Sequence, residues 1–210
     1  MPSSEKSIGS QNPVTRGEGG TRQRILDAAR LLFWEKGYNA TSMADILERS
    51  GARSGSFYYF FKSKAALLEG VLEEYLKGLQ PEVVAAVYAA STDPVERIFG
   101  LVGRYRGLLL HTNFTYGCPL GRLALEVDPE NLAALRLISA NFEGWKGVVR
   151  ECLEACGDRL AADVDRRALA VFVLTTMEGA VMQARVGRSI EPFDACVSQL
   201  QDYFRRLLVK

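Results

Sequence analysis

The sequence predicts an all-α protein with about nine helices. Apolar residues recur at the 3.6-residue spacing of amphipathic helices through nearly the whole chain from residue 21 onward. Glycines or Asp-Pro pairs stand where these periodic segments stop or start, at Gly37, Gly51, Gly157, Asp93-Pro94 and Asp128-Pro129. No run of four to eight residues alternates apolar and polar between turn signals, so no strand is expected.

Each helix is expected from its own periodicity and end signals. The expected helices run from Thr21 to a stop at Gly37; from a cap at Thr41 or Ser42 to Arg49; over 54–60; from a cap at Ser63, with an interruption at Pro81; over 94–111; over 119–126; from Asp128-Pro129 to Cys156; from Asp163 to Val186; and from Glu191 to the C-terminus. The segment 111–117 between two of them is expected to be a loop.

Composition excludes several classes of function. Apolar residues make up 48% of the chain and charged residues 24%, the mix of a globular protein with a core. Four cysteines without paired CxxC spacing and a single histidine predict no disulfide scaffold, no metal site and no cofactor. No paired carboxylates with a nucleophile and no phosphate-binding Gly loop appear, so we expect no enzyme.

Cellular location is inferred from the cysteines and from the absence of targeting signals. The cysteines suit a reducing compartment, and no apolar segment of a secretion signal is recognisable. The longest apolar stretch, 168–176, is too short to cross a bilayer. We therefore expect a cytoplasmic protein without a membrane partner.

Three regions are expected along the chain. Residues 1–20 are rich in Ser, Gly and Pro and are predicted to be a disordered tail. Residues 21–66 are predicted to form a helix-turn-helix domain, because two short helices meet at a Gly turn beside a third helix. Residues 67–210 are predicted to form a larger helical domain.

Charge favours nucleic acid as the partner of the first domain. Residues 21–64 carry eight basic and four acidic side chains, whereas the whole chain has a net charge of only +1. A locally basic helix-turn-helix attached to a neutral or acidic body is the charge pattern of a DNA-binding module.

The stretch from Gly37 to Leu72 resembles the N-terminal domain of the TetR family of transcriptional repressors. The resemblance rests on a Thr cap, an inward Ile, a Gly turn, a Gly in the recognition helix, an aromatic cluster and a Lys; here these are Thr41, Ile46, Gly51, Gly55, Phe57-Tyr58-Tyr59, Phe61 and Lys64. It covers about 50 residues, and the remaining 140 match the family only in outline. It implies a repressor that binds a pseudo-palindromic operator in double-stranded DNA and responds to a small-molecule effector.

Ten residues are predicted to contact DNA: Thr41, Ser42, Arg53, Ser54, Gly55, Ser56, Tyr58, Tyr59, Lys62 and Lys64. The caps leave helix amides near a phosphate, Gly55 permits close approach, and tyrosine hydroxyls suit phosphate or base contacts. Phe57 and Phe61 are expected in the core. Arg53 replaces the usual Ser or Thr and either reads guanine or binds phosphate; Phe60 replaces a His, so that phosphate contact is absent.

The resemblance also implies a homodimer formed through the last two helices. The segment 163–186 is apolar on more than one face, which an isolated surface helix would not tolerate. The final helix adds Phe193, Val197, Leu200 and Phe204. The alternative is that this apolar excess serves only the core of one chain.

An effector site in the larger domain is predicted from aromatic and polar residues in its helices. The candidates are Tyr105, His111, Phe114, Tyr116, Cys118, Trp145, Phe172, Met177 and Glu178. Plain core packing is the alternative for the aromatic ones. Glu178 lies inside an apolar helix and either binds a ligand, caps a neighbouring loop or pairs with an Arg across the dimer.

Cys118 supports a second functional hypothesis. The sequence Gly-Cys-Pro-Leu-Gly at 117–121 is similar to a motif in a branch of the family that includes electrophile-responsive repressors. A thiol at a helix N-terminus can be activated as a redox or electrophile sensor; the alternative is a buried packing thiol. Cys152 and Cys156 lie four residues apart on one helix and are expected to be filler rather than a metal or redox pair.

Overall fold

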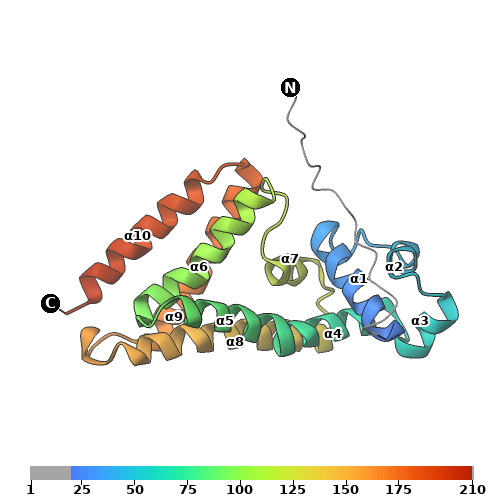
Figure 1. Ribbon diagram of the computed structural model, residues 1–210, viewed down its shortest axis with the longest axis horizontal. Coiled ribbons are helices and arrows are strands. Elements are labelled where there is room, and N and C mark those ends of the chain that lie inside the picture. Colours follow the sequence, from blue (N-terminus) through green and yellow to red (C-terminus); the bar gives the residue numbers. More distant parts are fainter. Residues whose placement is uncertain (1–19, 210) are drawn as a thin grey trace, which may run out of the picture.

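The computed structural model describes residues 20–209, and these residues are almost entirely helical (Figure 1). The all-α fold class is confirmed. All but one residue of the predicted tail 1–20 lies outside the described residues. Within the described part of the chain there are ten α-helices rather than nine, because the long helix expected from Ser63 is divided into two.

Four helices form a head at one end of the molecule. They are α1 (Thr21–Glu35), α2 (Met43–Ser50), α3 (Ser54–Phe60) and α4 (Lys64–Glu74). Both α2 and α3 pack on α1, and α4 runs from the head into the body (Figure 1). This order and packing are those of a helix-turn-helix held by a third helix.

Six further helices form the body. They are α5 (Gln80–Ala90), α6 (Pro94–His111), α7 (Pro119–Glu126), α8 (Leu132–Ala155), α9 (Arg166–Gly187) and α10 (Glu191–Leu207). The long helix α8 runs beside α4 and α5, and α9 packs against both α8 and α10. The short helix α7 lies between α6 and the head (Figure 1).

A π-helical turn, Tyr75–Leu79, separates α4 from α5. Pro81 follows it, and because proline has no backbone N–H, the carbonyl one turn earlier receives no regular helical hydrogen bond. The interruption expected at Pro81 is therefore present as a widened turn just before the proline.

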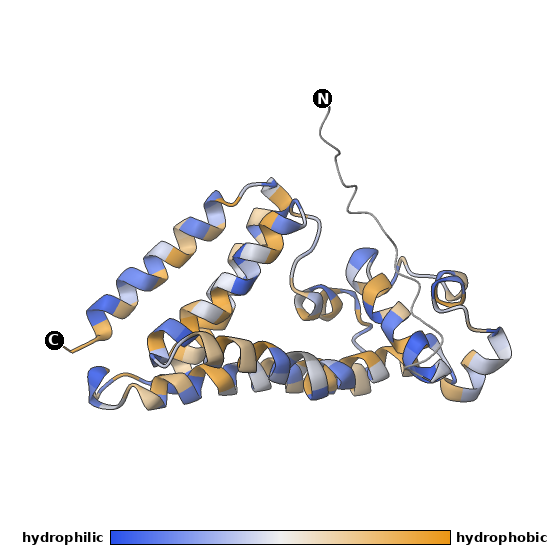
Figure 2. Cartoon of the chain, in the orientation of Figure 1, coloured by the Kyte–Doolittle hydropathy of each residue, from blue (hydrophilic) through white to orange (hydrophobic). Residues whose placement is uncertain are grey.

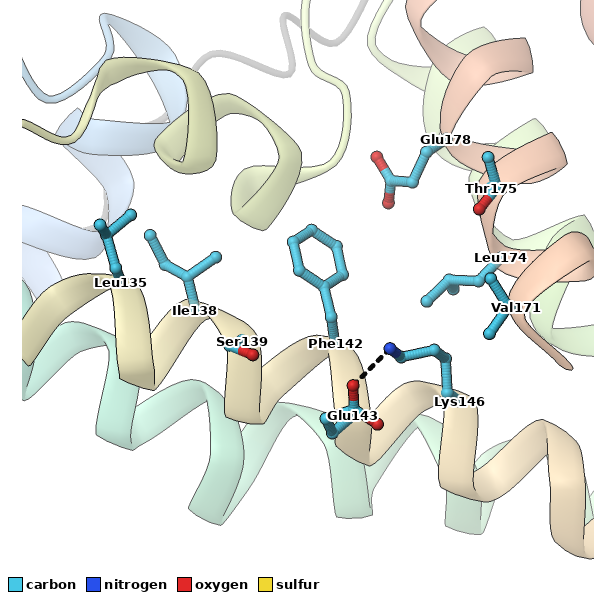
Figure 3. A pocket seen from close by; sticks show the side chains of 10 residues that line it. All are labelled: Leu135, Ile138, Ser139, Phe142, Glu143, Lys146, Val171, Leu174, Thr175 and Glu178. Carbon is cyan, nitrogen blue, oxygen red and sulfur yellow. Dashed lines mark hydrogen bonds and ion pairs between the residues drawn. The ribbon is translucent and has the colours of Figure 1, made fainter. Parts of the chain in front are cut away.

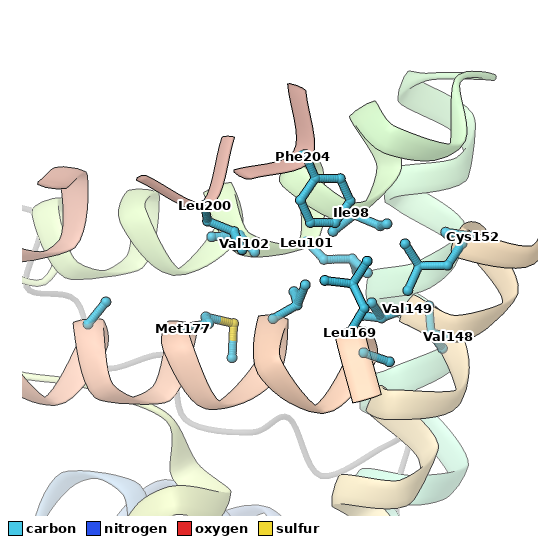
Figure 4. Packing of buried hydrophobic residues seen from close by; sticks show 14 of the residues in the cluster. Ile98, Leu101, Val102, Val148, Val149, Cys152, Leu169, Met177, Leu200 and Phe204 are labelled. Carbon is cyan, nitrogen blue, oxygen red and sulfur yellow. The ribbon is translucent and has the colours of Figure 1, made fainter. Parts of the chain in front are cut away.

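Two apolar cores run through the molecule. One joins the head to α7 and the first half of α8, and includes Ile46, Phe57, Leu123 and Ile138. The other joins α6, the second half of α8, α9 and α10 around residues such as Leu101, Val149, Met177 and Phe204 (Figure 4). Apolar positions gather on the inward sides of the helices (Figure 2). The domain boundary at residue 66 falls inside α4 and stays a prediction.

Two helix starts differ from expectation. α8 begins at Leu132 with Asn131 as its cap, because the Asp128 carboxylate accepts the Glu130 amide and forms a separate turn. α9 begins at Arg166, and Asp165 rather than Asp163 caps it, accepting the Arg167 and Ala168 amides at 2.9 Å each.

Helix α9 is longer and more apolar than the sequence segment 168–176 indicated. By length and composition alone it could cross a membrane. In the structure, however, it is a central helix of the body between α8 and α10, and residues such as Leu169, Val173, Met177 and Val181 lie in the core. Its apolar character therefore has a packing explanation.

Candidate nucleic-acid interface and body cavity

Helices α2 and α3 form a tight helix-turn-helix. Ser42 caps α2 in a reciprocal capping box: its hydroxyl accepts the Asp45 amide at 3.1 Å, and the Asp45 carboxylate accepts the Ser42 amide at 2.8 Å. Gly51 ends α2 with a φ of 62°, the left-handed conformation that glycine adopts without strain. Arg53 is the N-cap residue of α3, but its side chain makes no capping hydrogen bond.

Helix α3 divides its aromatic residues between the core and solvent. Phe57 is fully buried and Phe61 is 4% exposed, as expected for core residues. Tyr58 and Tyr59 are 52% and 76% exposed, and Ser54 and Gly55 are exposed beside them. A Cβ on Gly55 would meet nothing within 4 Å, so this face of α3 is open to a close-approaching surface. The exposed face of α3 is therefore the part of the head that we expect to enter a DNA groove.

The structure removes Thr41 from the predicted DNA-contacting residues. Its side chain is 1% exposed, and its hydroxyl donates to the Gly37 carbonyl at 2.6 Å. A buried, satisfied hydroxyl cannot reach a phosphate, and Ser42 rather than Thr41 caps α2. The Thr41 prediction is therefore wrong in its role.

Lys62 and Lys64 lie at the other end of α3. Lys62 is exposed, and its ammonium group donates to the Tyr58 carbonyl at 3.3 Å. The Lys64 ammonium lies 4.4 Å from the centre of the Tyr38 ring, and partial burial lowers its pKa. Lys62 is therefore next to Tyr58 and open to solvent, whereas Lys64 is half-buried against Tyr38.

Helix α7 fastens the end of α1 to the body. The Arg122 guanidinium donates to the Trp34, Glu35 and Lys36 carbonyls at the C-terminal end of α1, and it pairs with Glu126 at 2.8 Å. The Glu126 carboxylate also accepts the Asn39 amide at 2.9 Å. Burial alone would raise the pKa of Glu126, but these hydrogen bonds lower it overall. This contact ties α7 to the end of α1 and to the loop that follows it.

The Gly37 backbone makes this contact possible. Gly37 has a φ of 94°, and a Cβ at that position would lie 2.4 Å from Glu126 Oε1 and 2.6 Å from Arg122 Nη2. A residue with a side chain would thus be strained and would displace the ion pair.

A cavity of about 830 Å³ lies in the body next to α7. Six of the residues predicted for an effector site line it, which are Tyr105, His111, Cys118, Trp145, Met177 and Glu178. Its size and its mostly apolar walls with a few polar groups are those of a small-molecule site.

Three of the predicted effector residues lie elsewhere. Phe172 is 48% exposed and makes an edge contact with Tyr203 of α10, so it belongs to the outer face of α9. Tyr116 stacks on Trp34 with ring centres 4.5 Å apart. Phe114 packs against the second core from a loop position with a φ of 60°. None of the three lines the cavity, so their assignment to its wall is wrong.

The cavity also has walls that the sequence did not indicate. Arg30 and Trp34 come from α1, and Tyr75 comes from the π-helical turn. The indole N–H of Trp34 donates to the Gly117 carbonyl at 2.8 Å. Arg30 and Trp34 belong to the predicted head, so only the packing of the head against the body reveals that they face this space.

Glu178 lies at the first turn of α7. A Cβ on Gly121 would lie 2.6 Å from Glu178 Oε2, so the carboxylate occupies space that a side chain would fill. Burial raises the pKa of Glu178, and a hydrogen bond with the Cys118 thiol opposes that shift. Cys118 rather than Glu178 caps α7, since its sulfur accepts the Gly121 amide, so the role of Glu178 stays a prediction.

The pKa of Cys118 is raised by burial and by the nearby Glu178 carboxylate. The Tyr105 hydroxyl and the Gly121 amide both donate to its sulfur at 3.4 Å, but they do not offset the burial. The thiol is therefore protonated near neutral pH and is not activated in this conformation.

A second hollow of about 460 Å³ adjoins the cavity between α8 and α9 (Figure 3). The two share Phe142, Leu174 and Glu178. Figure 3 shows Glu178 and Phe142 directed from opposite helices toward this space, with Lys146 paired to Glu143 beside them. The shared residues form the boundary between the cavity and the α8–α9 groove.

Replacing Glu178 by glutamine is expected to flatten part of the pH dependence of stability. Because the folded pKa is raised above the ordinary value of 4.5, the carboxyl binds its proton more tightly in the folded state. Stability is therefore lost as pH rises from 4.5 through the folded pKa. In thermal unfolding measured from pH 4 to pH 8, the melting temperature of Glu178→Gln should rise relative to that of the parent protein as the pH increases. A constant difference at every pH would contradict this.

Comparison with known proteins assigns the family. Residues 25–71 match the family described as bacterial regulatory proteins, tetR family, and residues 94–199 match the LmrA/YxaF-like transcriptional regulator C-terminal domain. The chain belongs to the TetR family of bacterial transcriptional regulators. TetR-family proteins are DNA-binding regulators rather than enzymes, so this chain is a helix-turn-helix transcriptional regulator.

Similar TetR-family proteins align with nearly the whole chain. An uncharacterised HTH-type regulator of Mycobacterium tuberculosis, Rv0196, is 33% identical over 87% of this chain and 93% of its own length. The repressor DhaR of a Mycobacterium species is 27% identical over 82% of this chain and 86% of its own. The structure of a CifR cysteine mutant complexed with 26-bp operator DNA has a TM-score of 0.71 and 28% identity, and covers 91% of this chain and 98% of that one.

Proposed function

We propose that this chain is a cytoplasmic repressor that a small apolar inducer releases from a pseudo-palindromic operator. The observation that carries the proposal is the cavity of about 830 Å³, whose walls include residues of α1 and of the π-helical turn as well as body helices. A ligand there touches the head and the body together. It shifts the orientation of the head to the extent that it binds one arrangement better than the other.

The exposed side chains of α3 support the DNA-contacting part of the proposal. Tyr58 and Tyr59 are solvent-exposed beside Arg53, Ser54 and Gly55, and Ser42, Ser56 and Lys62 lie on adjoining turns of the head. Arg53 supplies a guanidinium at the start of α3, where side chains most easily reach base edges or phosphates. With Lys64 added and Thr41 withdrawn, this is the proposed contact set.

The contact between α7 and α1 provides the route from ligand to head. The first turn of α7 borders the cavity through Cys118, Pro119 and Leu120, and its last turns hold α1 through Arg122 and Glu126. A ligand that displaces the start of α7 would therefore move the end of α1. A movement of α1 alters the separation of the two recognition helices in a dimer.

Fluorescence anisotropy with a labelled operator tests the proposal. A small apolar compound that binds the cavity should raise the thermal midpoint of the protein, since a ligand at 100 times its Kd adds about 2.7 kcal/mol. The same compound should lower operator affinity. A set of compounds that stabilise the protein and leave operator affinity unchanged would contradict the inducer role.

An exposed apolar face on α9 supports a homodimer. Val171, Phe172, Met182 and Val186 are between 43% and 81% exposed, although the opposite face of the same helix lies in the core. Phe172 contacts Tyr203 of α10, so the two helices present one continuous surface. A contiguous exposed apolar surface on a soluble protein is typical of an interface.

A single charge on this face should separate the subunits. Met182→Glu places a carboxylate in the centre of the proposed interface, and burying an unpaired charge is strongly unfavourable. Sedimentation velocity should show a monomer for this variant. Leu125→Glu, at an 84% exposed position on α7, is the control and should remain dimeric. Equal dimer content in both variants would contradict the interface.

A thiol-sensing repressor is the second candidate, because Cys118 lines the same cavity. The burial that raises its pKa argues against reactivity in this conformation. We therefore expect Cys118→Ser to keep operator binding and to leave the response to oxidants and alkylators unchanged, as measured by anisotropy with and without each reagent. Loss of that response in the variant would instead favour the thiol sensor.

A further inference from the structure

We propose that the cavity recognises an organic acid, with Arg30 and Tyr75 binding its carboxylate and the apolar walls holding its hydrocarbon body. The inference rests on the proposed function and names the chemical class of the inducer. It starts from two polar side chains that line the same cavity.

Tyr75 supplies an unused hydrogen-bond donor. Its side chain is 3% exposed, yet among the described residues its hydroxyl makes no hydrogen bond. Burial raises the pKa of this phenol, so the hydroxyl stays protonated and able to donate. Because Tyr75 lines the cavity, a ligand bound there can accept a hydrogen bond from this hydroxyl.

Arg30 supplies the charge. It lies on α1 at the cavity wall, and within the described part of the chain it makes no ion pair and no side-chain hydrogen bond. Arg30 and Tyr75 line the same cavity, and the charge of Arg30 opposes the rise in the pKa of Tyr75. A guanidinium beside a hydroxyl donor is suited to a carboxylate.

The charges around the cavity agree with an anionic ligand. Arg30 and Arg104 are the cations of its wall, and Glu178 is its one acid. Glu178 lies on α9 against the first turn of α7, where it interacts with the Cys118 thiol. The two cations outnumber the one acid, so the charges of the wall favour an anionic ligand that pairs with Arg30.

The places of Arg30 and Tyr75 in the fold would let a bound carboxylate affect the orientation of the head. Arg30 belongs to the first helix of the head, and Tyr75 begins the π-helical turn that links the head to the body. A carboxylate held by both would fix the head relative to the body directly, in addition to the route through α7.

Three probes of equal chain length test the inference: decanoate, decanol and decylamine, each kept below its solubility limit and below the concentration at which it aggregates. Isothermal titration calorimetry measures binding to the full-length protein, and operator anisotropy measures release. We expect decanoate to bind about tenfold more tightly than decanol. Arg30→Gln should abolish that preference, and Tyr75→Phe should reduce it. Tyr88→Phe, which removes a hydroxyl outside the cavity wall, should retain it.

The outcomes separate this inference from the proposed function. Equal binding of decanoate and decanol, a decanoate preference that survives Arg30→Gln, or tightest binding of decylamine would each overturn carboxylate recognition. Decanoate binding that depends on Arg30 without any loss of operator affinity would keep the site and overturn the inducer role. Failure of all three probes to bind would overturn both.

Discussion

Phe57→Ala is expected to destabilise the head by about 3–5 kcal/mol, the usual cost of truncating a fully buried phenylalanine. Phe57 is completely buried on the inner face of α3, where its ring contacts Phe61 with the centres 5.9 Å apart. The cavity left by its removal lies between α1 and α3, and neither helix can move inward without breaking the helix-turn-helix geometry. Operator binding should be lost with the fold of the head.

The neighbouring residue provides a matched control for this prediction. Phe60 is on the same helix but is 37% exposed. Phe60→Ala should therefore lower the free energy of unfolding by well under half as much as Phe57→Ala. Native-state hydrogen exchange of the head amides together with thermal unfolding gives the two free energies. Similar losses for Phe57→Ala and Phe60→Ala would show that α3 does not bury the face described above.

Tyr59→Ala is expected to weaken operator binding about tenfold, which corresponds to about 1.4 kcal/mol. Tyr59 is the most exposed aromatic residue of α3, at 76%, and makes no hydrogen bond within the described chain, so its removal costs the folded protein little. Its ring and hydroxyl are available for a phosphate or base contact in the groove. Sedimentation should show the dimer unchanged, and operator anisotropy should show the loss.

Lys62 separates the electrostatic contribution to operator binding from the other contributions. Lys62→Ala should weaken binding and reduce the slope of log affinity against log salt by about 1, because one phosphate contact is lost. Tyr59→Ala should leave that slope unchanged, since no charge is removed. Unaltered operator affinity at physiological salt for both variants would show that α3 is not the DNA-contacting helix.

Local signals predicted the head well, because its features depend on neighbouring residues. The Gly51 turn, the Ser42 cap and the inward position of Phe57 each follow from spacing within a few residues. Thr41 was assigned wrongly because two adjacent hydroxyl residues could both cap α2. Only the chain path after Gly37 decides which of them is buried.

The cavity could be predicted only in part, because it is formed by elements far apart in sequence. Cys118 and Glu178 carried a local anomaly, a thiol at a helix start and a carboxyl in an apolar helix, and both line the cavity. Arg30 and Tyr75 carried no such signal. Arg30 lies on α1 and Tyr75 in the π-helical turn, and both face the cavity through the packing of the head against the body, which helical periodicity does not encode.

The positions where helices begin could also be predicted only in part from the sequence. Asp93-Pro94 and Asp128-Pro129 carry the same signal, yet only the first pair opens a helix in the structure. Asn131 provides a second, competing cap three residues later and takes the amide of Ala134. Where two caps compete, the packing of the following apolar face decides between them, and for α8 the helix that meets α4 begins at Leu132.

Selection of bound duplexes from a random pool, followed by footprinting, tests the central claim most directly. If α2 and α3 present the DNA-contacting surface twice in a symmetric dimer, the enriched sequences should form an inverted repeat. The two protected half-sites should be centred about 34–36 Å apart, or a multiple of that spacing. Retention of no duplex even at low ionic strength, or protection of a single asymmetric site, would contradict the account.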